Sequence, residues 1–239
     1  IHTRNRGKEE PAKTDNIFID CGCENKEQVE KLGVHVGCVI TFQDELTELN
    51  DKFYSGRALD NRVGGFMIAE VARLLHESKT KLPFGLYIVN AVQEEIGLRG
   101  AAMIAARIKP QVAIITDVCH DTTAPMYNKI TSGDLVAGKG PVLAYGASVH
   151  KKLLDLIIDS ARKREIDFQR AAASRATGTD TDAFAYSNEG VPSALISLPL
   201  KYMHTTVETA SKEDIQQVIQ LIKGFLEDFD PKFDFRYVV

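Results

Sequence analysis

The sequence contains no stretch of about 18 consecutive apolar residues, the length that a membrane-spanning helix needs. It also has no run of clustered Lys and Arg, and 29 basic against 33 acidic residues give a formal net charge of −4. This balance gives no electrostatic reason to expect a nucleic acid or an anionic membrane as a partner. With 44% hydrophobic and 26% charged residues and no repeat, the 239 residues have the composition of a globular protein with a large core.

Cysteine is scarce, with four residues at positions 21, 23, 38 and 119. Cys21 and Cys23 are too close for a comfortable disulfide, and no second Cys/His pair follows at zinc-finger spacing. We therefore expect a structural or incidental role for the thiols and a cytoplasmic location. Residues 1–7 lack the positive region and apolar run of a signal peptide.

The first part of the chain reads as a small β-rich unit. Residues 17–20 and 38–42 are short apolar runs that predict strands, and the charged segment 26–32, which ends at a glycine, predicts a short helix. We expect residues 1–53 to form this unit and residues 54–239 to form a larger domain.

The larger part alternates helix and strand patterns, which predicts an α/β fold with a mostly parallel central sheet flanked by helices. Helices are expected at 60–76, 98–107, 149–164, 182–186 and 211–229, and strands at 83–92, 112–116 and 193–198. Ser211 with Asp214 three residues later marks the start of the last helix.

One glycine-rich segment imitates a nucleotide-binding motif. Residues 133–139 fit the first seven positions of a phosphate-binding loop. The next position should be Ser or Thr at the start of a helix, but it is Gly140, followed by Pro141 and an extended run. We therefore interpret the segment as a connection.

Carboxylates gather at the ends of expected elements. Glu94 and Glu95 follow one strand and Asp117 follows another, while Asp60 opens a helix and His204 lies just beyond a strand. Ligands of open α/β sheets bind outside the carboxyl ends of the strands, so these side chains can converge.

Each of these residues also has an ordinary interpretation. Glu94 and Glu95 suit a solvated loop, Asp60 suits a helix N-cap, Asp117 suits a turn, and a lone His204 is usually a surface residue. Taken together, four carboxylates at one edge would repel one another unless cations neutralised them. Asp and His are ligands for zinc-like ions. Of the glutamate pair, one can then bind metal while the other takes a proton from water whose pKa the metal has lowered.

The residues that carry this pattern resemble a known family. The motifs are Ala58-Leu-Asp60-Asn-Arg62-Val-Gly64, Val92-Gln-Glu94-Glu95-Ile-Gly97, Thr116-Asp117-Val, Gly178-Thr-Asp180, Gly190-Val-Pro192 and Tyr202-Met-His204-Thr205. In this order they look like metallopeptidase family 42, the TET and glutamyl aminopeptidases, and the resemblance runs from about residue 17 to the last helix.

The resemblance implies a dinuclear metal aminopeptidase that hydrolyses N-terminal residues from peptides. By that resemblance, Asp60 bridges two divalent ions, zinc or cobalt, Glu95 and His204 complete one site, Asp117 binds the other ion, and Glu94 is the general base. It also implies a catalytic domain with an inserted β-rich domain, of which residues 1–53 are the end, and self-association into dimers and large hollow homo-oligomers. Substrate-binding residues cannot be assigned.

One family feature is missing from the sequence. The second metal needs a histidine from a His-x-Asp motif placed before the insert, and no histidine here has Asp two residues later. We expect that the chain lacks the N-terminal part of the catalytic domain. Two alternatives stay open: a pseudo-peptidase or assembly subunit that has lost one metal, and an endoglucanase-type glycoside hydrolase, a label that some family members carry. The latter needs two carboxyl groups about 5 to 9.5 Å apart.

Overall fold

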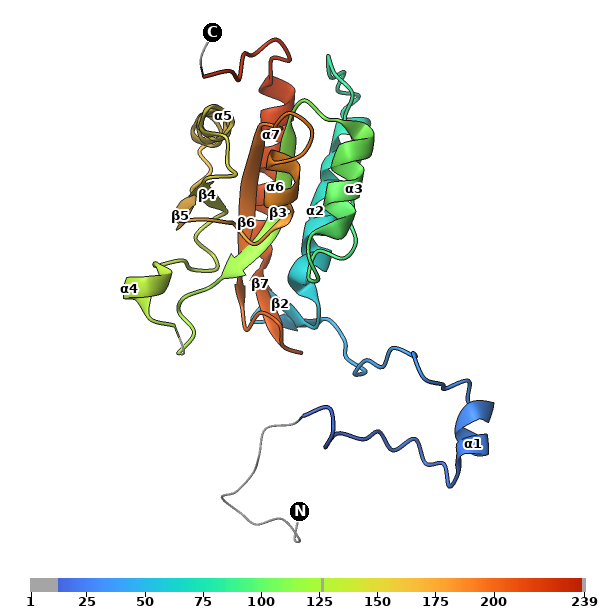
Figure 1. Ribbon diagram of the computed structural model, residues 1–239. Coiled ribbons are helices and arrows are strands. Elements are labelled where there is room, and N and C mark those ends of the chain that lie inside the picture. Colours follow the sequence, from blue (N-terminus) through green and yellow to red (C-terminus); the bar gives the residue numbers. More distant parts are fainter. Residues whose placement is uncertain (1–12, 126, 238–239) are drawn as a thin grey trace. The chain divides into compact units, whose positions relative to one another are not determined.

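The computed structural model describes residues 13–125 and 127–237 (Figure 1). The chain separates into two compact units, residues 1–43 and 44–239. Residues 1–7, on which the expectation about a signal peptide falls, lie outside the described part. The expected division into domains after residue 53 stays a prediction.

The described part of the first unit contains one helix. Helix α1 (Lys26–Lys31) begins after Asn25, whose side chain accepts a hydrogen bond from the N–H of Gln28 at 3.1 Å. The strands expected at 17–20 and 38–42 do not form, which corrects the sequence-based prediction. A strand needs a hydrogen-bonded partner, and within residues 13–43 these apolar runs stay exposed, with Phe18 at 89%.

A seven-stranded sheet organises the second unit. Its strands are β1 (Thr47–Leu49), β2 (Phe53–Gly56), β3 (Ala113–His120), β4 (Val142–Gly146), β5 (Gln169–Ala173), β6 (Ser193–Lys201) and β7 (Glu208–Ser211). The order is β1-β2-β7-β6-β4-β5, and β3 pairs with β6. The central strand β6 is buried along nearly its whole length.

The sheet is mixed, which corrects the expectation of a mostly parallel one. The pairs β3–β6 and β4–β5 are parallel, whereas β1–β2, β2–β7, β4–β6 and β6–β7 are antiparallel. The β6–β7 pair is antiparallel because the chain turns back between these strands, and the β1–β2 hairpin extends that edge, while β4 runs antiparallel to β6 independently of this turn. The expected α/β class, with a central sheet flanked by helices, is confirmed.

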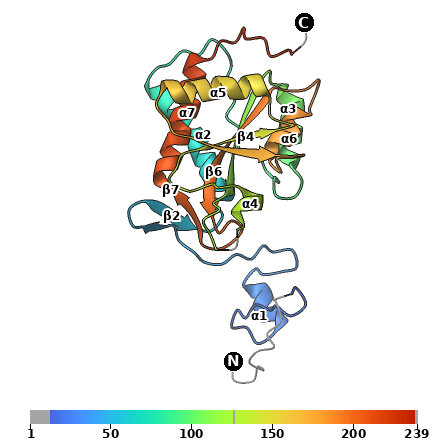
Figure 2. The same cartoon turned by 90° about the vertical axis from the view of Figure 1, so that its left-hand side faces the viewer.

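The helices of this unit are α2 (Leu59–Glu77), α3 (Arg99–Ile108), α4 (Lys129–Ser132), α5 (Lys151–Lys163), α6 (Asp180–Ala185) and α7 (Lys212–Asp228). Helices α2, α7 and α5 pack beside one another, while α3 packs on α6, which contacts β3 and β6. Figure 2 shows α2 and α7 on one side of β6, with α3 and α6 on the other. No helix among the described residues is both long and apolar enough to cross a membrane.

The sequence predicts five of these six helices to within a few residues, and the four-residue α4 is not among the expected helices. In α2, Val63, Met67, Val71 and Leu75 recur every fourth residue and are buried in the core. Helix α7 begins as expected, because the Ser211 hydroxyl accepts a hydrogen bond from the N–H of Asp214 at 3.2 Å.

Residues 83–92, expected as a buried strand, are not assigned to a strand. None of the β-ladders among the described residues includes this segment, and Tyr87 in it is 68% exposed. The apolar pattern is that of a strand, but the neighbour that a ladder requires is not among the described residues.

Candidate metal centre

Asp60 lies in the first turn of α2. The backbone enters this turn through Ala58, which has a left-handed φ of 55°, and the peptide bond between Asp60 and Asn61 is cis. Asp60 is not the N-cap of its helix, because that position is Ala58. Asn61 fixes the turn against the sheet, since its Nδ2 donates to the carbonyl of Thr116 at 2.9 Å.

Glu94 and Glu95 lie on a tight turn. Gln93 has a left-handed φ of 60°, and the carbonyl of Glu94 accepts hydrogen bonds from the N–H groups of Gly97 and Leu98 at 3.0 Å each. The backbone thus turns at this pair, and the two neighbouring carboxylates take different environments. The Glu94 side chain is half-buried and that of Glu95 is exposed.

Asp117 lies in β3, and His204 follows β6, the parallel strand beside it. Asp117 lies within β3 rather than after it, is 8% exposed, and accepts a hydrogen bond from the N–H of Val118 at 2.8 Å. His204 follows β6 in a loop and itself has a left-handed φ of 63°. Residues other than glycine that adopt a left-handed backbone conformation are strained, and they occur often at functional sites. In this conformation the imidazole of His204 lies beside Asp60 of α2.

Three of the expected ligands meet. His204 Nε2 lies 3.1 Å from Asp60 Oδ2 and 3.4 Å from Glu95 Oε2. One ligand atom from each of the three residues lies within 4.8 Å of the others, a spacing at which they could hold a metal ion. Asp117 and Glu94 are near enough to Asp60 to interact with it electrostatically.

A buried carboxylate that sequence analysis missed holds two of these residues together. Glu208, at the start of β7, is 2% exposed. Its two oxygens accept hydrogen bonds from the backbone N–H of Asp60 at 3.0 Å and from that of His204 at 2.6 Å. Glu208 therefore fixes the start of α2 against the loop after β6.

Burial and mutual repulsion raise the pKa values of the clustered acids. Burial, followed by the charges of Glu95 and Glu208, raises the pKa of Asp60 to about 6. Burial raises the pKa of Asp117 to about 7, although its hydrogen bond from Val118 opposes the shift. Without a cation, Asp117 is about half protonated at neutral pH and Asp60 becomes largely protonated only below about pH 6, so a bound cation would stabilise their charged forms.

Glu94 is perturbed in the same direction. Burial raises its pKa to about 7, and the charges of Asp180, Glu95 and Asp60 add to the effect. A carboxyl group that titrates near neutrality is suited to accept and return a proton during a reaction.

Asp180 is a second neighbour that sequence analysis assigned no role. It begins α6, burial raises its pKa, and its Oδ1 is buried without a hydrogen-bond partner among the described residues. The loop before it is tied down by Asp182, which accepts hydrogen bonds from Ser148 Oγ at 2.5 Å and from the N–H of Gly178 at 3.0 Å.

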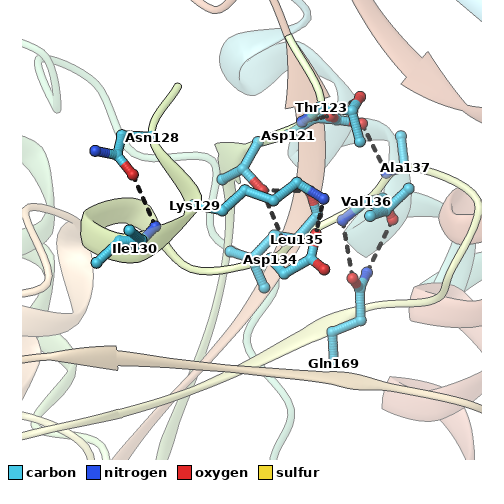
Figure 3. A network of polar contacts seen from close by, with 11 residues as sticks. Asp121, Thr123, Asn128, Lys129, Ile130, Asp134, Leu135, Val136, Ala137 and Gln169 are labelled. Carbon is cyan, nitrogen blue, oxygen red and sulfur yellow. Dashed lines mark hydrogen bonds and ion pairs between the residues drawn. The ribbon is translucent and has the colours of Figure 1, made fainter. Parts of the chain in front are cut away.

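The glycine-rich loop that imitates a nucleotide site has its amides engaged within the protein. The N–H groups of Gly138 and Gly140 donate to the buried carboxylate of Asp214 at 2.7 and 2.9 Å. The N–H of Ala137 donates to Asp121 at 2.8 Å (Figure 3). Acidic side chains thus occupy the donors that a phosphate would need.

Comparisons with known proteins place the whole motif set in one group. The family model described as M42 glutamyl aminopeptidase matches residues 1–221. A lysyl aminopeptidase of Pyrococcus furiosus is 36% identical over 234 residues, which cover 96% of this chain and 65% of that protein.

Solved structures agree in fold. A TET aminopeptidase of Thaumarchaeota archaeon SCGC AB-539-E09 is 28% identical, with a TM-score of 0.88 and coverage of 96% of this chain and 65% of that chain. The TET1 peptidase of Pyrococcus horikoshii, described as able to assemble into a tetrahedron or a large octahedral shell, is 27% identical, with a TM-score of 0.73 and coverage of 93% and 67%. The chain thus spans about two thirds of these relatives.

Proposed function

This chain belongs to the M42 glutamyl aminopeptidase family, and from that premise we propose that the protein is a metal-dependent aminopeptidase that releases N-terminal residues from peptides. The observation that carries the proposal is the convergence of Asp60, Glu95 and His204, whose ligand atoms lie within 4.8 Å of one another. The protein's activity depends on these residues together with Glu94 and Asp117.

The donor set fits divalent ions such as zinc or cobalt. Carboxylates and imidazole are ligands for these ions. The raised pKa values of Asp60 and Asp117 show that their charged forms are destabilised in the metal-free protein, and a nearby cation would stabilise them. We propose that Asp60, Glu95 and His204 would hold one ion and that Asp117, together with Asp60, would hold a second. When bound, the ions supply Lewis-acid polarisation of the scissile carbonyl and lower the pKa of water.

Glu94 is proposed as the general base and then the general acid. Its carboxylate accepts a proton from the water whose oxygen attacks the carbonyl carbon. It returns that proton to the nitrogen of the leaving amine as the carbon–nitrogen bond breaks. The half-buried position of Glu94, close enough to Glu95 and Asp60 to interact with their charges, supports this role.

Location and assembly are proposed on separate grounds. The four cysteines are free thiols, which fits a reducing cytoplasm. The assembly described for the Pyrococcus horikoshii relative supports self-association into dimers and larger homo-oligomers.

The test is peptide hydrolysis by the protein with its native flanking sequence. We expect release of the first residue from short peptides with a free N-terminus, no release from the same peptides after acetylation, and loss of turnover on chelation that zinc or cobalt restores. Equal cleavage of acetylated peptides, or turnover that resists chelation, would contradict the proposal. Chelator-resistant cleavage of a soluble glucan would instead support a glycoside hydrolase.

A further inference from the structure

Helix α6 carries two aspartates in its first turn, and their environments differ. The carboxylate of Asp182 accepts a hydrogen bond from Ser148 Oγ at 2.5 Å. It also accepts from the N–H groups of Thr177 and Gly178 at 3.2 and 3.0 Å. Burial opposes the shift, but these hydrogen bonds lower the pKa of Asp182. For Asp180, burial raises the pKa, and its buried Oδ1 has no hydrogen-bond donor among the described residues.

Helix α6 lies between the elements that carry the candidate metal centre. It packs on α3, which begins just after the turn of Glu94 and Glu95, and on β3, which contains Asp117. Figure 2 shows α3 and α6 on the same side of β6. Asp180 is the first residue of α6 and is close enough to Glu94 and Asp117 for its charge to act on both. A further carboxylate thus lies beside the expected ligands and the expected base.

A half-buried anion in this position is unfavourable as long as the centre holds no cation. Buried charges in proteins are normally paired with an opposite charge or with hydrogen-bond donors. The described neighbours that act on Asp180 are carboxylates, which repel it. Divalent ions at the centre would reverse the sign of this interaction, because their charge is the largest in such a site. A carboxylate near the ligands would in turn strengthen the attraction for the ions.

We propose that Asp180 is an outer carboxylate of the metal centre, which attracts divalent ions without being one of their ligands, and that Asp182 is the residue that positions it. Asp182 binds the loop 177–178 on one side and Ser148, in the segment before α5, on the other. It thereby fixes the first turn of α6 against the rest of the domain. The inference rests on the proposed metal-dependent function and adds two residues to it.

Hydroxyl groups around Asp180 restrict the same turn. Thr179 precedes the helix, and its hydroxyl accepts a hydrogen bond from the N–H of Thr181 at 3.2 Å and donates to the Thr181 hydroxyl at 2.9 Å. Thr177 Oγ1 lies 3.0 Å from Thr179 Oγ1. Thr179 and Thr181 are buried. The backbone on both sides of Asp180 is therefore held by hydrogen bonds in which the Asp180 carboxylate has no part.

A purely structural role for Asp180 makes a different prediction. An asparagine keeps a carbonyl oxygen that can accept a hydrogen bond, but it carries no charge. If Asp180 served only as an acceptor, Asp180→Asn would leave metal binding unchanged. If its charge attracts cations, the same substitution weakens metal binding even though the fold is kept.

Calorimetric titration of the chelator-treated protein, with its native flanking sequence, against zinc tests the role of Asp180. We expect Asp180→Asn to bind zinc about 10- to 100-fold more weakly than wild type. In chelator at pH 8 its free energy of unfolding should be no lower than that of wild type, because an uncompensated charge is removed. The exposed Asp159→Asn on α5 is the matched control and should bind zinc as wild type does.

The outcomes separate this inference from the proposed function. Equal zinc affinity of Asp180→Asn and wild type would overturn the inference and leave the proposed function intact. Weaker binding accompanied by lower stability in chelator would assign Asp180 a structural role and would also overturn it. A wild-type protein that binds no zinc would contradict both.

A double-mutant cycle tests the role of Asp182. Asp182→Ala should weaken zinc binding by a similar factor in wild type, because Asp180 is no longer held, but should add no further loss to Asp180→Asn. Ser148→Ala removes one of the hydrogen bonds to Asp182 and is the milder variant if Asp182→Ala does not fold. Its effect on zinc binding should likewise disappear in Asp180→Asn. Additive losses would show that Asp182 acts independently of Asp180 and would overturn its positioning role.

Discussion

The carboxylate of Glu208 accepts a hydrogen bond from the backbone N–H of Asp60 at 3.0 Å across 148 residues of sequence. Its other oxygen accepts one from His204, so one buried side chain positions both residues. The distance between Asp60 and His204, on which the candidate metal site depends, is therefore set by the protein itself.

Replacing Glu208 with Gln should loosen this arrangement. The amide NH₂ faces one backbone N–H and cannot accept from it, which leaves a buried donor unpaired at a cost of roughly 1–3 kcal/mol. We expect lower stability in urea unfolding and about 10- to 100-fold weaker zinc binding by calorimetry. The exposed Glu45→Gln is the control, and a Glu208→Gln variant that matches wild type in both measurements would contradict this role.

Gly100 supports the turn that carries Glu94 and Glu95. A Cβ at this position would lie 2.4 Å from the carbonyl oxygen of Val92, which accepts the N–H of Gly100. Gly100→Ala should therefore displace the turn, lowering stability by about 1–3 kcal/mol and reducing turnover. Gly65→Ala, in α2 with the nearest contact at 3.4 Å from a side chain, is the control and should be neutral or stabilising. Thermal unfolding and peptide hydrolysis measure both effects, and equal behaviour of the two variants would refute the argument.

The pKa of Asp117 predicts a pH dependence of stability. Burial raises this pKa from 3.8 to about 7, so the folded state binds the proton more tightly than the unfolded state. This contribution to stability is present below about pH 4 and is lost as the pH rises through about 7. Asp117→Asn does not titrate, so in chelator its free energy of unfolding should rise relative to that of wild type by up to about 3 kcal/mol from pH 4.5 to 8.

Urea unfolding at several pH values measures this difference. The exposed Asp167→Asn serves as control and should track wild type at every pH. With zinc present, the trend for wild type should reverse, because the metal binds the deprotonated carboxylate. A constant difference between Asp117→Asn and wild type across this range would contradict the assigned pKa shift.

Asp214 closes the glycine-rich loop by accepting from Gly138 and Gly140. Asp214→Ala should leave both buried N–H groups unpaired and lower the free energy of unfolding by several kcal/mol, at roughly 1–3 kcal/mol for each group. The neighbouring exposed Glu213→Gln should have little effect. ATP with magnesium should not shift the melting temperature of wild type beyond the effect of magnesium alone, and a larger shift would contradict this interpretation of the loop.

The sequence predicts much of this structure because its signals are local. Helical periodicity predicts helices such as α2 and α7. Glu94 and His204 are recognisable as candidate site residues because each follows an apolar run that predicts a strand. Glu208 gives no such signal, since β7 has four residues and a glutamate is normally a sign of exposure. Only the tertiary fold shows that its two oxygens meet two backbone donors.

Strand direction and pairing are equally non-local. The sheet is mixed because β7 turns back along β6, which no alternation of apolar residues can indicate. The run 83–92 has the composition of a strand, but pairing depends on a partner elsewhere. Asp180 lies in a recognisable motif, while its buried oxygen and its closeness to Glu94 appear only in three dimensions.

The most direct test of the proposed chemistry is metal content and turnover of Glu94→Gln, measured together in the protein with its native flanking sequence. Wild type and the exposed control Glu189→Gln should bind the same metal and hydrolyse peptides alike. Glu94→Gln should retain the wild-type metal content by elemental analysis while kcat falls by about 10²- to 10⁴-fold, the usual range for a lost general base. Full turnover by Glu94→Gln would contradict the assignment of Glu94 as the base.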